Sequence, residues 1–282
     1  MNRLLLITKP QKDYELLDSG GEEKLERYGA YVLARPDPQA LWKKGLGDRE
    51  WGIANGKYTR KGKEGEWVEN NLPKQWEIEF GGLKFYVRPT SFKHTGLFPE
   101  QLSNWEWIAA QKPKTVLNLF GYTGGASLAA AKAGAQVTHV DASKTAVAWA
   151  RENAKLSGLE DAPVRWIVED VLVYLKREIK RGSKYDLILL DPPAFGHGPG
   201  GELWKIEEDF LPLMELIPQL LSDKPVGVLI NGYAAGYSPL AFAYNLEPLV
   251  KKYGGSIEYG DLTIEDKSGR VLPCGIFARW HA

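Results

Sequence analysis

The chain has 282 residues, enough to bury a large core as one big domain or two modest ones. Its 36 basic and 36 acidic residues balance, which argues against a protein whose main role is to coat nucleic acid, although a local basic face remains compatible. The single cysteine, Cys274, excludes an internal disulfide and favours the reducing cytoplasm as the location.

Two further classes of protein are disfavoured. No apolar run approaches the roughly 20 residues of a membrane span, and the apolar start of the chain is too short for the core of a signal peptide. The four histidines never fall at metal-ligand spacing with Cys274. We therefore expect neither a membrane segment nor a metal.

Residues 1–95 predict a small antiparallel β domain, with substrate or RNA binding as its possible role. Glycine, proline and asparagine turns separate short β-compatible runs. These runs are Leu4–Thr8, Ala30–Ala34, Glu66–Val68, Trp76–Phe80 and Leu83–Val87. Gly81-Gly82 between the last two indicates a two-residue hairpin turn. We expect one short helix over Glu22–Tyr28.

A basic cluster lies inside this β-rich region, at Lys57, Arg60, Lys61 and Lys63. Tryptophan and tyrosine side chains flank it, and aromatic rings interleaved with positive charge can stack on bases and pair with phosphates. The four side chains are candidate RNA contacts. A solvated hairpin tip beside core tryptophans would give the same pattern.

Residues 96–282 predict an α/β domain with a Rossmann-like parallel sheet, because strand and helix patterns alternate almost without interruption. The expected strands are Thr115–Phe120, Gln136–Val140, Val164–Val168, Tyr185–Leu190, Val226–Asn231, Ser256–Ile264 and Val271–Trp280. The expected helices are Pro99–Gln111, Ala126–Ala135, Lys144–Leu156, Val171–Arg181, Glu207–Leu221 and Pro239–Tyr253. The last two strands are close enough in sequence to pair antiparallel.

The first of these strands leads into a glycine turn, Gly121 to Gly125, and then a helix. Glycines let the backbone turn tightly and approach a ligand, and the helix start adds unpaired N–H groups. Asp141 ends the next strand, where an acid accepts hydrogen bonds from a ribose diol. The NAD fingerprint Gly-x-Gly-x-x-Gly is absent, and S-adenosylmethionine (SAM), which carries no phosphate, fits the Gly-x-x-Gly-Gly order better.

Two more strands end in aspartates. Asp170 is expected to accept from the adenine amino group, with Val171 packing on the ring. The run Asp191-Pro-Pro-Ala-Phe195 follows an apolar strand. Pro192 and Pro193 make a rigid lip, Asp191 offers an acceptor to a nucleophilic nitrogen or to the cofactor amine, and Phe195 can stack on a planar base. We therefore assign the catalytic role to these four residues.

Three motifs together resemble the bacterial 23S rRNA base methyltransferase family, which makes 5-methylcytosine or 7-methylguanine. They are Asn118-Leu-Phe-Gly-Tyr-Thr-Gly-Gly125, Asp191-Pro-Pro-Ala-Phe195 and Thr95-Gly-Leu-Phe-Pro-Glu-Gln101. The resemblance implies a class I SAM-dependent methyltransferase with the Thr95–Gln101 segment over the cofactor. The cofactor-binding residues expected are Phe98, Gln101, Asn118, Phe120, Gly121, Tyr122, Thr123, Gly124, Asp141, Ala142, Ser143, Asp170, Val171 and Asp191.

The absence of a cysteine nucleophile limits the methyl-transfer reactions that the sequence favours. The family's cytosine-5 branch has a cysteine after the fifth strand, where this chain reads Leu229-Ile-Asn-Gly-Tyr-Ala-Ala-Gly236. Covalent attack at C5 is therefore disfavoured, and methylation of a nucleobase nitrogen in RNA is the leading hypothesis. A small-molecule or protein acceptor and a non-catalytic SAM-binding protein are the alternatives. A homodimer is also possible.

Overall fold

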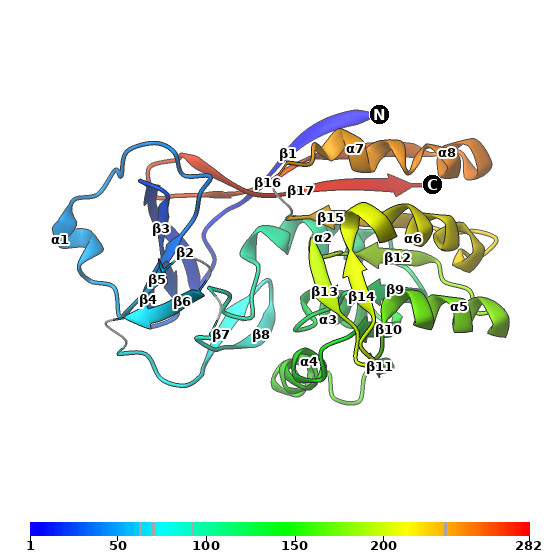
Figure 1. Ribbon diagram of the computed structural model, residues 1–282, viewed down its shortest axis with the longest axis horizontal. Helices are drawn as coiled ribbons and strands as arrows, with labels where there is room; N and C mark the ends of the chain where they lie inside the picture. Colours follow the sequence, from blue (N-terminus) through cyan, green and yellow to red (C-terminus); the bar gives the residue numbers. More distant parts are fainter. Residues whose placement is uncertain (62–63, 69–70, 92, 234–235) are drawn as a thin grey trace. The chain divides into compact units, whose positions relative to one another are not determined.

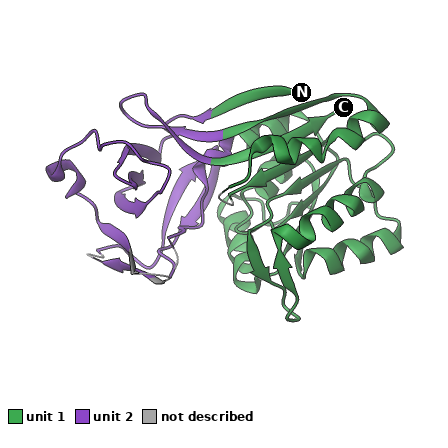
Figure 2. Ribbon diagram, turned by 45° about the horizontal axis from the view of Figure 1, so that its top comes forward, with its two compact units in different colours: residues 1–6, 103–261, 275–282 green, residues 7–102, 262–274 purple. Residues whose placement is uncertain are grey.

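The computed structural model describes residues 1–61, 64–68, 71–91, 93–233 and 236–282, without the side chains of Arg60, Lys61 and Glu64. Its residues group into two compact units (Figures 1 and 2). Unit 1 comprises residues 1–6, 103–261 and 275–282, and unit 2 comprises residues 7–102 and 262–274. Both units are discontinuous in sequence, whereas the sequence analysis divided the chain once, between residues 95 and 96. The role expected of the β-rich part stays a prediction.

Unit 1 is built on a large sheet whose central strands are parallel. The strands, in their order across the sheet, are β1 (Asn2–Thr8), β16 (Ser256–Glu265), β17 (Val271–His281), β15 (Gly227–Gly232), β12 (Leu187–Leu190), β9 (Thr115–Leu119), β10 (Gln136–Asp141) and β11 (Val164–Val168). The parallel part of the sheet begins in the chain at β9, extends outward through β10 to β11, and continues with β12 on the other side of β9. β17 pairs antiparallel with β15. The predicted fold class is confirmed.

Helices cover both faces of this sheet. They are α2 (Leu102–Ala110), α3 (Gly125–Lys132), α4 (Lys144–Leu156), α5 (Val171–Arg181), α6 (Ile206–Leu220), α7 (Pro239–Tyr244) and α8 (Glu247–Tyr253), with the short 3-10 helix η1 (Pro99–Gln101) before α2. Side chains alternate between the faces of a strand, so Leu117 and Ile188 pack with α5, α6, α7 and α8 in one core cluster. Asn118, on the opposite face of β9, bonds to α3.

Unit 2 is rich in β structure. Its larger sheet has the strand order β2 (Tyr14–Gly20), β3 (Glu23–Tyr28), β4 (Tyr31–Pro36), β5 (Gly56–Lys61) and β6 (Glu64–Val68). A separate hairpin joins β7 (Trp76–Phe80) to β8 (Leu83–Val87). Gly81 and Gly82 have φ of 59° and 70°, as the predicted two-residue turn requires. The short helix α1 (Asp48–Trp51) packs on the larger sheet through Trp51.

The expected helix over Glu22–Tyr28 is wrong, because this segment forms strand β3. Gly21 and Glu22 both have φ of 60° and make the hairpin turn from β2. β3 then lies between β2 and β4 and pairs with both. The charged composition of the segment suits an exposed helix, but the partner strands on both sides override that local preference.

Two other differences are local. The helix expected over Pro239–Tyr253 is interrupted, with α7 ending at Tyr244 and α8 beginning at Glu247. Pro248, in the first turn of α8, cannot continue a helix because its ring clashes with the carbonyl four residues earlier. After Asp191-Pro-Pro, a hairpin of β13 (Phe195–His197) and β14 (Leu203–Lys205) forms, which the sequence analysis did not predict.

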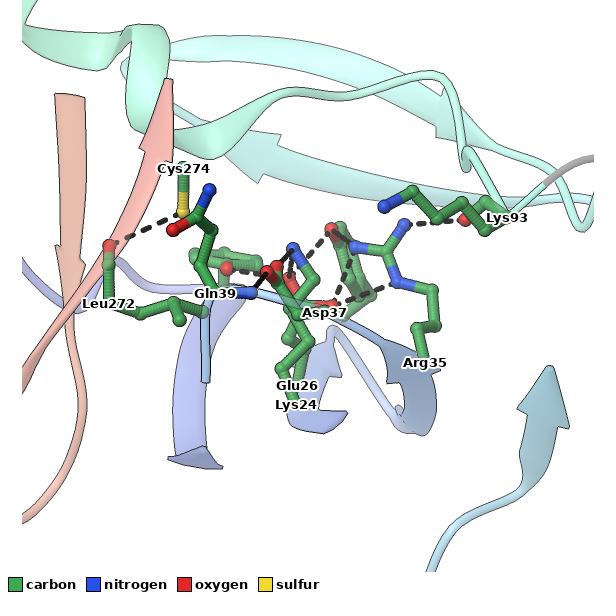
Figure 3. A network of polar contacts seen from close by, with 10 residues as sticks. Lys24, Glu26, Arg35, Asp37, Gln39, Lys93, Leu272 and Cys274 are labelled. Carbon is green, nitrogen blue, oxygen red and sulfur yellow. Dashed lines mark hydrogen bonds and ion pairs between the residues drawn. The ribbon is translucent and has the colours of Figure 1, made fainter. Parts of the chain in front are cut away.

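A buried ionic network stabilises unit 2 (Figure 3). The Glu26 side chain is fully buried, and Arg35 donates to its Oε2 through Nε at 2.8 Å and Nη2 at 2.6 Å. Lys24 Nζ lies 3.7 Å from Glu26 Oε1 and 3.3 Å from Asp37 Oδ2. Arg35 also donates through Nη1 to the Lys93 carbonyl at 2.7 Å, which fixes the start of the segment that leads to η1.

The network makes the stability of unit 2 pH-dependent. Burial by itself raises the pKa of Glu26, but Arg35 and Lys24 outweigh burial and hold that pKa below its usual 4.5. A carboxylate with a lowered folded-state pKa stabilises the fold above its unfolded pKa. That stabilisation is lost as the pH falls from 4.5 through the folded-state pKa.

Replacing Arg35 by Met should destabilise unit 2 by about 3–5 kcal/mol at pH 7, because Glu26 would remain buried without its main partner. Chemical denaturation followed by near-ultraviolet circular dichroism measures this loss. Lys12→Met is the control, since Lys12 forms an exposed ion pair with Glu79 and should change the midpoint little. Equal effects of the two substitutions would contradict a structural role for the network.

Candidate functional site

Loops at one edge of the unit 1 sheet contain most of the predicted site residues. β9 pairs in parallel with β10 and β12, and Leu119 is level with both Val140 and Leu190. The residues that follow these strands, Gly121 and its neighbours, Asp141 and Asp191, therefore emerge together at the carboxyl edge. β9 and β12 are the strands at which the direction of chain progression reverses, and open α/β sheets bind ligands beyond this point.

The glycine turn after β9 has an unusual backbone. Phe120 has φ of 58°, Tyr122 of 49° and Gly124 of 91°, so three of five consecutive residues are left-handed. For the two aromatic residues this conformation costs about 1–3 kcal/mol each, and it persists only where surrounding contacts impose it. Here the Gly121 N–H donates to the Val140 carbonyl and the Gly124 N–H to the Gly121 carbonyl, both at 3.0 Å.

Asp141 fixes this loop from the neighbouring strand. Its Oδ2 accepts from the Tyr122 N–H and its Oδ1 from the Ser143 N–H, both at 2.8 Å. Burial raises the pKa of Asp141 despite these two N–H donors. A carboxylate has about four acceptor positions, so a half-buried Asp141 retains capacity to accept from a diol. This chemistry fits the ribose contact that the sequence analysis predicts.

The loop also rests on a buried polar chain. The Asn118 amide donates to Ser127 Oγ at 2.8 Å, and Ser127 Oγ lies 2.9 Å from His139 Nδ1. A Cβ on Gly121 would come within 2.5 Å of the His139 ring, so only glycine fits above it. Burial lowers the pKa of His139 to about 3, which keeps the ring neutral near pH 7. Asn118 was expected at the cofactor, whereas its amide hydrogen bond lies inside the fold.

Asp170 and Val171 begin helix α5. Asp170 is its N-cap, and Oδ1 accepts from the Val173 N–H at 2.9 Å. The Asp170 side chain thus has one oxygen committed to the helix. Val171 is 2% exposed and packs in the core cluster of unit 1. Their predicted contacts with an adenine ring stay predictions.

The Asp191-Pro-Pro-Ala-Phe segment is held by Trp204, a residue that the sequence analysis did not select. Trp204 Nε1 donates to the Pro193 carbonyl at 2.7 Å, and its ring packs against Phe120 with 4.9 Å between centroids. Trp204 therefore couples the predicted acceptor segment to the glycine loop. Phe195 is 56% exposed on β13, with its ring free of the core as base stacking requires.

The remaining predicted cofactor residues belong to both units. Ser143 caps helix α4 by accepting from the Ala146 N–H at 3.2 Å, with Ala142 beside it in the chain. The buried Thr123 accepts through its carbonyl from Asn153 at 3.0 Å. Phe98 and Gln101 belong to unit 2. Their role over the cofactor stays a prediction.

The predicted RNA contacts are only partly described. Lys57 forms an ion pair with Glu23 at 3.4 Å. Lys63 and the side chains of Arg60 and Lys61 lie outside the described residues. Within the described ranges, no group of three or more histidine, cysteine or acidic side chains is arranged to hold a metal. The helices described there also include none long and apolar enough to cross a membrane.

Comparison with known proteins identifies similar sequences and folds. The model of the S-adenosylmethionine-dependent methyltransferase family matches residues 15–240. A crystal structure of a SAM-dependent methyltransferase from Agrobacterium tumefaciens is 41% identical, with a TM-score of 0.94 over 99% of this chain and 95% of that one.

Two curated relatives have ribosomal names. Ribosomal RNA large subunit methyltransferase K/L of Shewanella frigidimarina is 33% identical over 77% of this chain and 33% of its own length. Ribosomal RNA large subunit methyltransferase I of Aeromonas salmonicida is 36% identical over 56% of this chain and 40% of its own. This chain therefore spans less than half the length of these two relatives.

Gly121→Ala should weaken SAM binding about 10- to 100-fold, because the added methyl group meets the His139 ring and displaces the loop. Isothermal titration calorimetry with SAM measures the change. The double variant Gly121→Ala/His139→Ser removes the ring and should recover much of the affinity. Unchanged affinity in the single variant would show that the loop does not hold the cofactor.

Proposed function

Because the chain belongs to the S-adenosylmethionine-dependent methyltransferase family, we propose that it methylates a nucleobase nitrogen in RNA, with ribosomal RNA as the substrate class. The enzyme class and the cofactor expected from the sequence agree with this membership. The RNA substrate is inferred from the relatives, two of which carry ribosomal RNA methyltransferase names.

The observation that supports a base as the acceptor is the segment Asp191-Pro-Pro-Ala-Phe195 beside the glycine loop. Trp204 holds both, which gives the segment a fixed position relative to the predicted cofactor site. Phe195 offers an exposed ring for stacking, and the Asp191 carboxylate offers an acceptor for an N–H group. Together they suit a planar, nitrogen-bearing acceptor.

Nitrogen rather than carbon is favoured because a cysteine nucleophile is lacking. Residues 229–236, which comprise the end of β15 and the segment after it, contain no cysteine. Burial raises the pKa of Cys274 well above its ordinary value, and its thiol donates to the Leu272 carbonyl at 3.4 Å. A thiol whose pKa is raised stays protonated and is a poor nucleophile, which argues against covalent C5 chemistry at Cys274.

When bound, SAM would supply the acceptor nitrogen with a methyl group that is activated by its positively charged sulfur. Asp191 would accept the hydrogen bond from that nitrogen and orient its lone pair. Pro192 and Pro193 would keep Asp191 and Phe195 in place, since their rings restrict the backbone. Most of the rate enhancement would come from positioning, because an in-line displacement needs little covalent assistance.

Total RNA from a strain that lacks the gene should accept labelled methyl groups from SAM in the presence of the protein. Wild-type RNA should not, because its site is already methylated. Nuclease digestion of the labelled RNA then identifies the base. Absence of label in both RNAs, with SAM binding intact, would overturn the RNA proposal and favour a small-molecule or protein acceptor.

Asp191→Ala should lower methyl transfer to the deletion-strain RNA by about 100-fold or more, because the nitrogen loses its hydrogen-bond acceptor. SAM affinity, measured by calorimetry, should change much less. Asp223→Ala, in the loop after α6, is a matched control that should retain full activity. Full activity of Asp191→Ala would assign the acceptor role to another residue.

Lys57, Arg60, Lys61 and Lys63 remain the proposed phosphate contacts of unit 2. A cytoplasmic location agrees with a single cysteine in the chain. A homodimer is a further possibility that sedimentation of the purified protein decides.

A further inference from the structure

Asn231 occupies a notable place at the carboxyl edge of the unit 1 sheet. It lies near the end of β15, which pairs in parallel with β12, and Ile230 is level with Leu190. Asn231 is therefore level with Asp191, one strand away. Neighbouring strands lie about 4.8 Å apart, so the two backbones are close.

Extending the register of β12 and β15 by one residue assigns positions 191 and 231 to the same face of the sheet. A Cβ on Gly227 would lie 3.2 Å from Leu187 Cδ1, which places positions 227 and 187 on a common face. Side chains alternate along a strand, so positions four residues further on, Asn231 and Asp191, share that face as well. Helix α2 covers it, because the same Cβ would lie 2.9 Å from the Trp107 ring.

Asn104 of α2 fixes the orientation of the Asn231 amide. Its Nδ2 donates to Asn231 Oδ1 at 2.9 Å, and Asn231 is only 6% exposed. With Oδ1 occupied, Asn231 presents its Nδ2 donor group, which has no hydrogen-bond partner within the described part of the chain. Asn231 Nδ2 is not among the fully buried polar atoms without a partner in the described residues, so this donor is open to a ligand at the carboxyl edge of the sheet.

We infer that Asn231 is a second recognition residue for the acceptor base, donating to an oxygen or ring nitrogen beside the N–H that Asp191 accepts. Every nucleobase places a donor next to an acceptor on its Watson–Crick edge, and an Asp–Asn pair on adjacent strands complements such an edge. A hydroxyl or simple amine acceptor offers no matching pair. The inference rests on the proposed function, and it explains why a buried asparagine is placed there.

The test uses Asn231→Asp and Asn231→Ala on deletion-strain ribosomal RNA with labelled SAM. Asp keeps the acceptor for Asn104 but replaces the donor group by an oxygen, whereas Ala removes both. Both variants should lower kcat about 10- to 100-fold, because a misplaced base loses reactivity while contacts elsewhere keep the RNA bound. KM for RNA should change less than kcat, and calorimetry should give an unchanged SAM affinity.

Controls separate recognition from packing. Asn245→Ala removes an exposed asparagine that donates to the Ala241 carbonyl and should keep full activity. Denaturation midpoints show whether Asn231→Asp folds as the wild type does. Full activity of Asn231→Asp would overturn the inference, because only the bond to Asn104 would then matter. A loss of SAM affinity parallel to the loss of activity would overturn it as well. A wild type inactive on RNA would instead refute the proposed function and the inference with it.

Discussion

The carboxylate of Asp141 imposes the constraint on which the candidate site depends. By accepting from the N–H groups of Tyr122 and Ser143, it ties the end of β10 to the turn after β9 and to the start of α4. Together with the bond from the Gly121 N–H to the Val140 carbonyl, these bonds maintain the left-handed backbone of Phe120 and Tyr122. The acid that helps to maintain this strain is also the one predicted to accept from a ribose, so the predicted ligand contact depends on the geometry of the loop.

In the proposed function, the two halves of the carboxyl edge serve different purposes. The half formed by β9, β10 and β11 contains the glycine loop and the acids expected at the cofactor. The half formed by β12 and β15 contains Asp191 and Asn231, and Trp204 joins the halves through Phe120 and Pro193. An acceptor held on one half can thus be aligned with a methyl donor on the other, provided that Trp204 keeps the glycine loop and the Asp191–Phe195 segment in fixed relative positions.

Local sequence signals predicted the spans of many helices and strands well, but they predicted contacts between distant residues poorly. The spans of α4, α5, β7, β8 and β11 agree with the prediction, because apolar periodicity, the caps Ser143 and Asp170 and the Gly81-Gly82 turn are all local signals. β3 was mistaken for a helix because its pairing with β2 and β4 is not local. The contacts of Trp204 and Asn231 were missed for the same reason, since they involve residues that are distant in the sequence.

The sequence by itself determined the Rossmann-like fold, the family and the cofactor, since a glycine turn after a buried strand and an acid at the end of the next one are readable within about 30 residues. Only the tertiary structure decided which side chains face one another. Asn118 donates to Ser127 beneath the loop, and Asn231 lies level with Asp191 although 40 positions separate them in the chain. Such contacts follow from strand order and register, which are set by packing across the whole sheet rather than by neighbours in sequence.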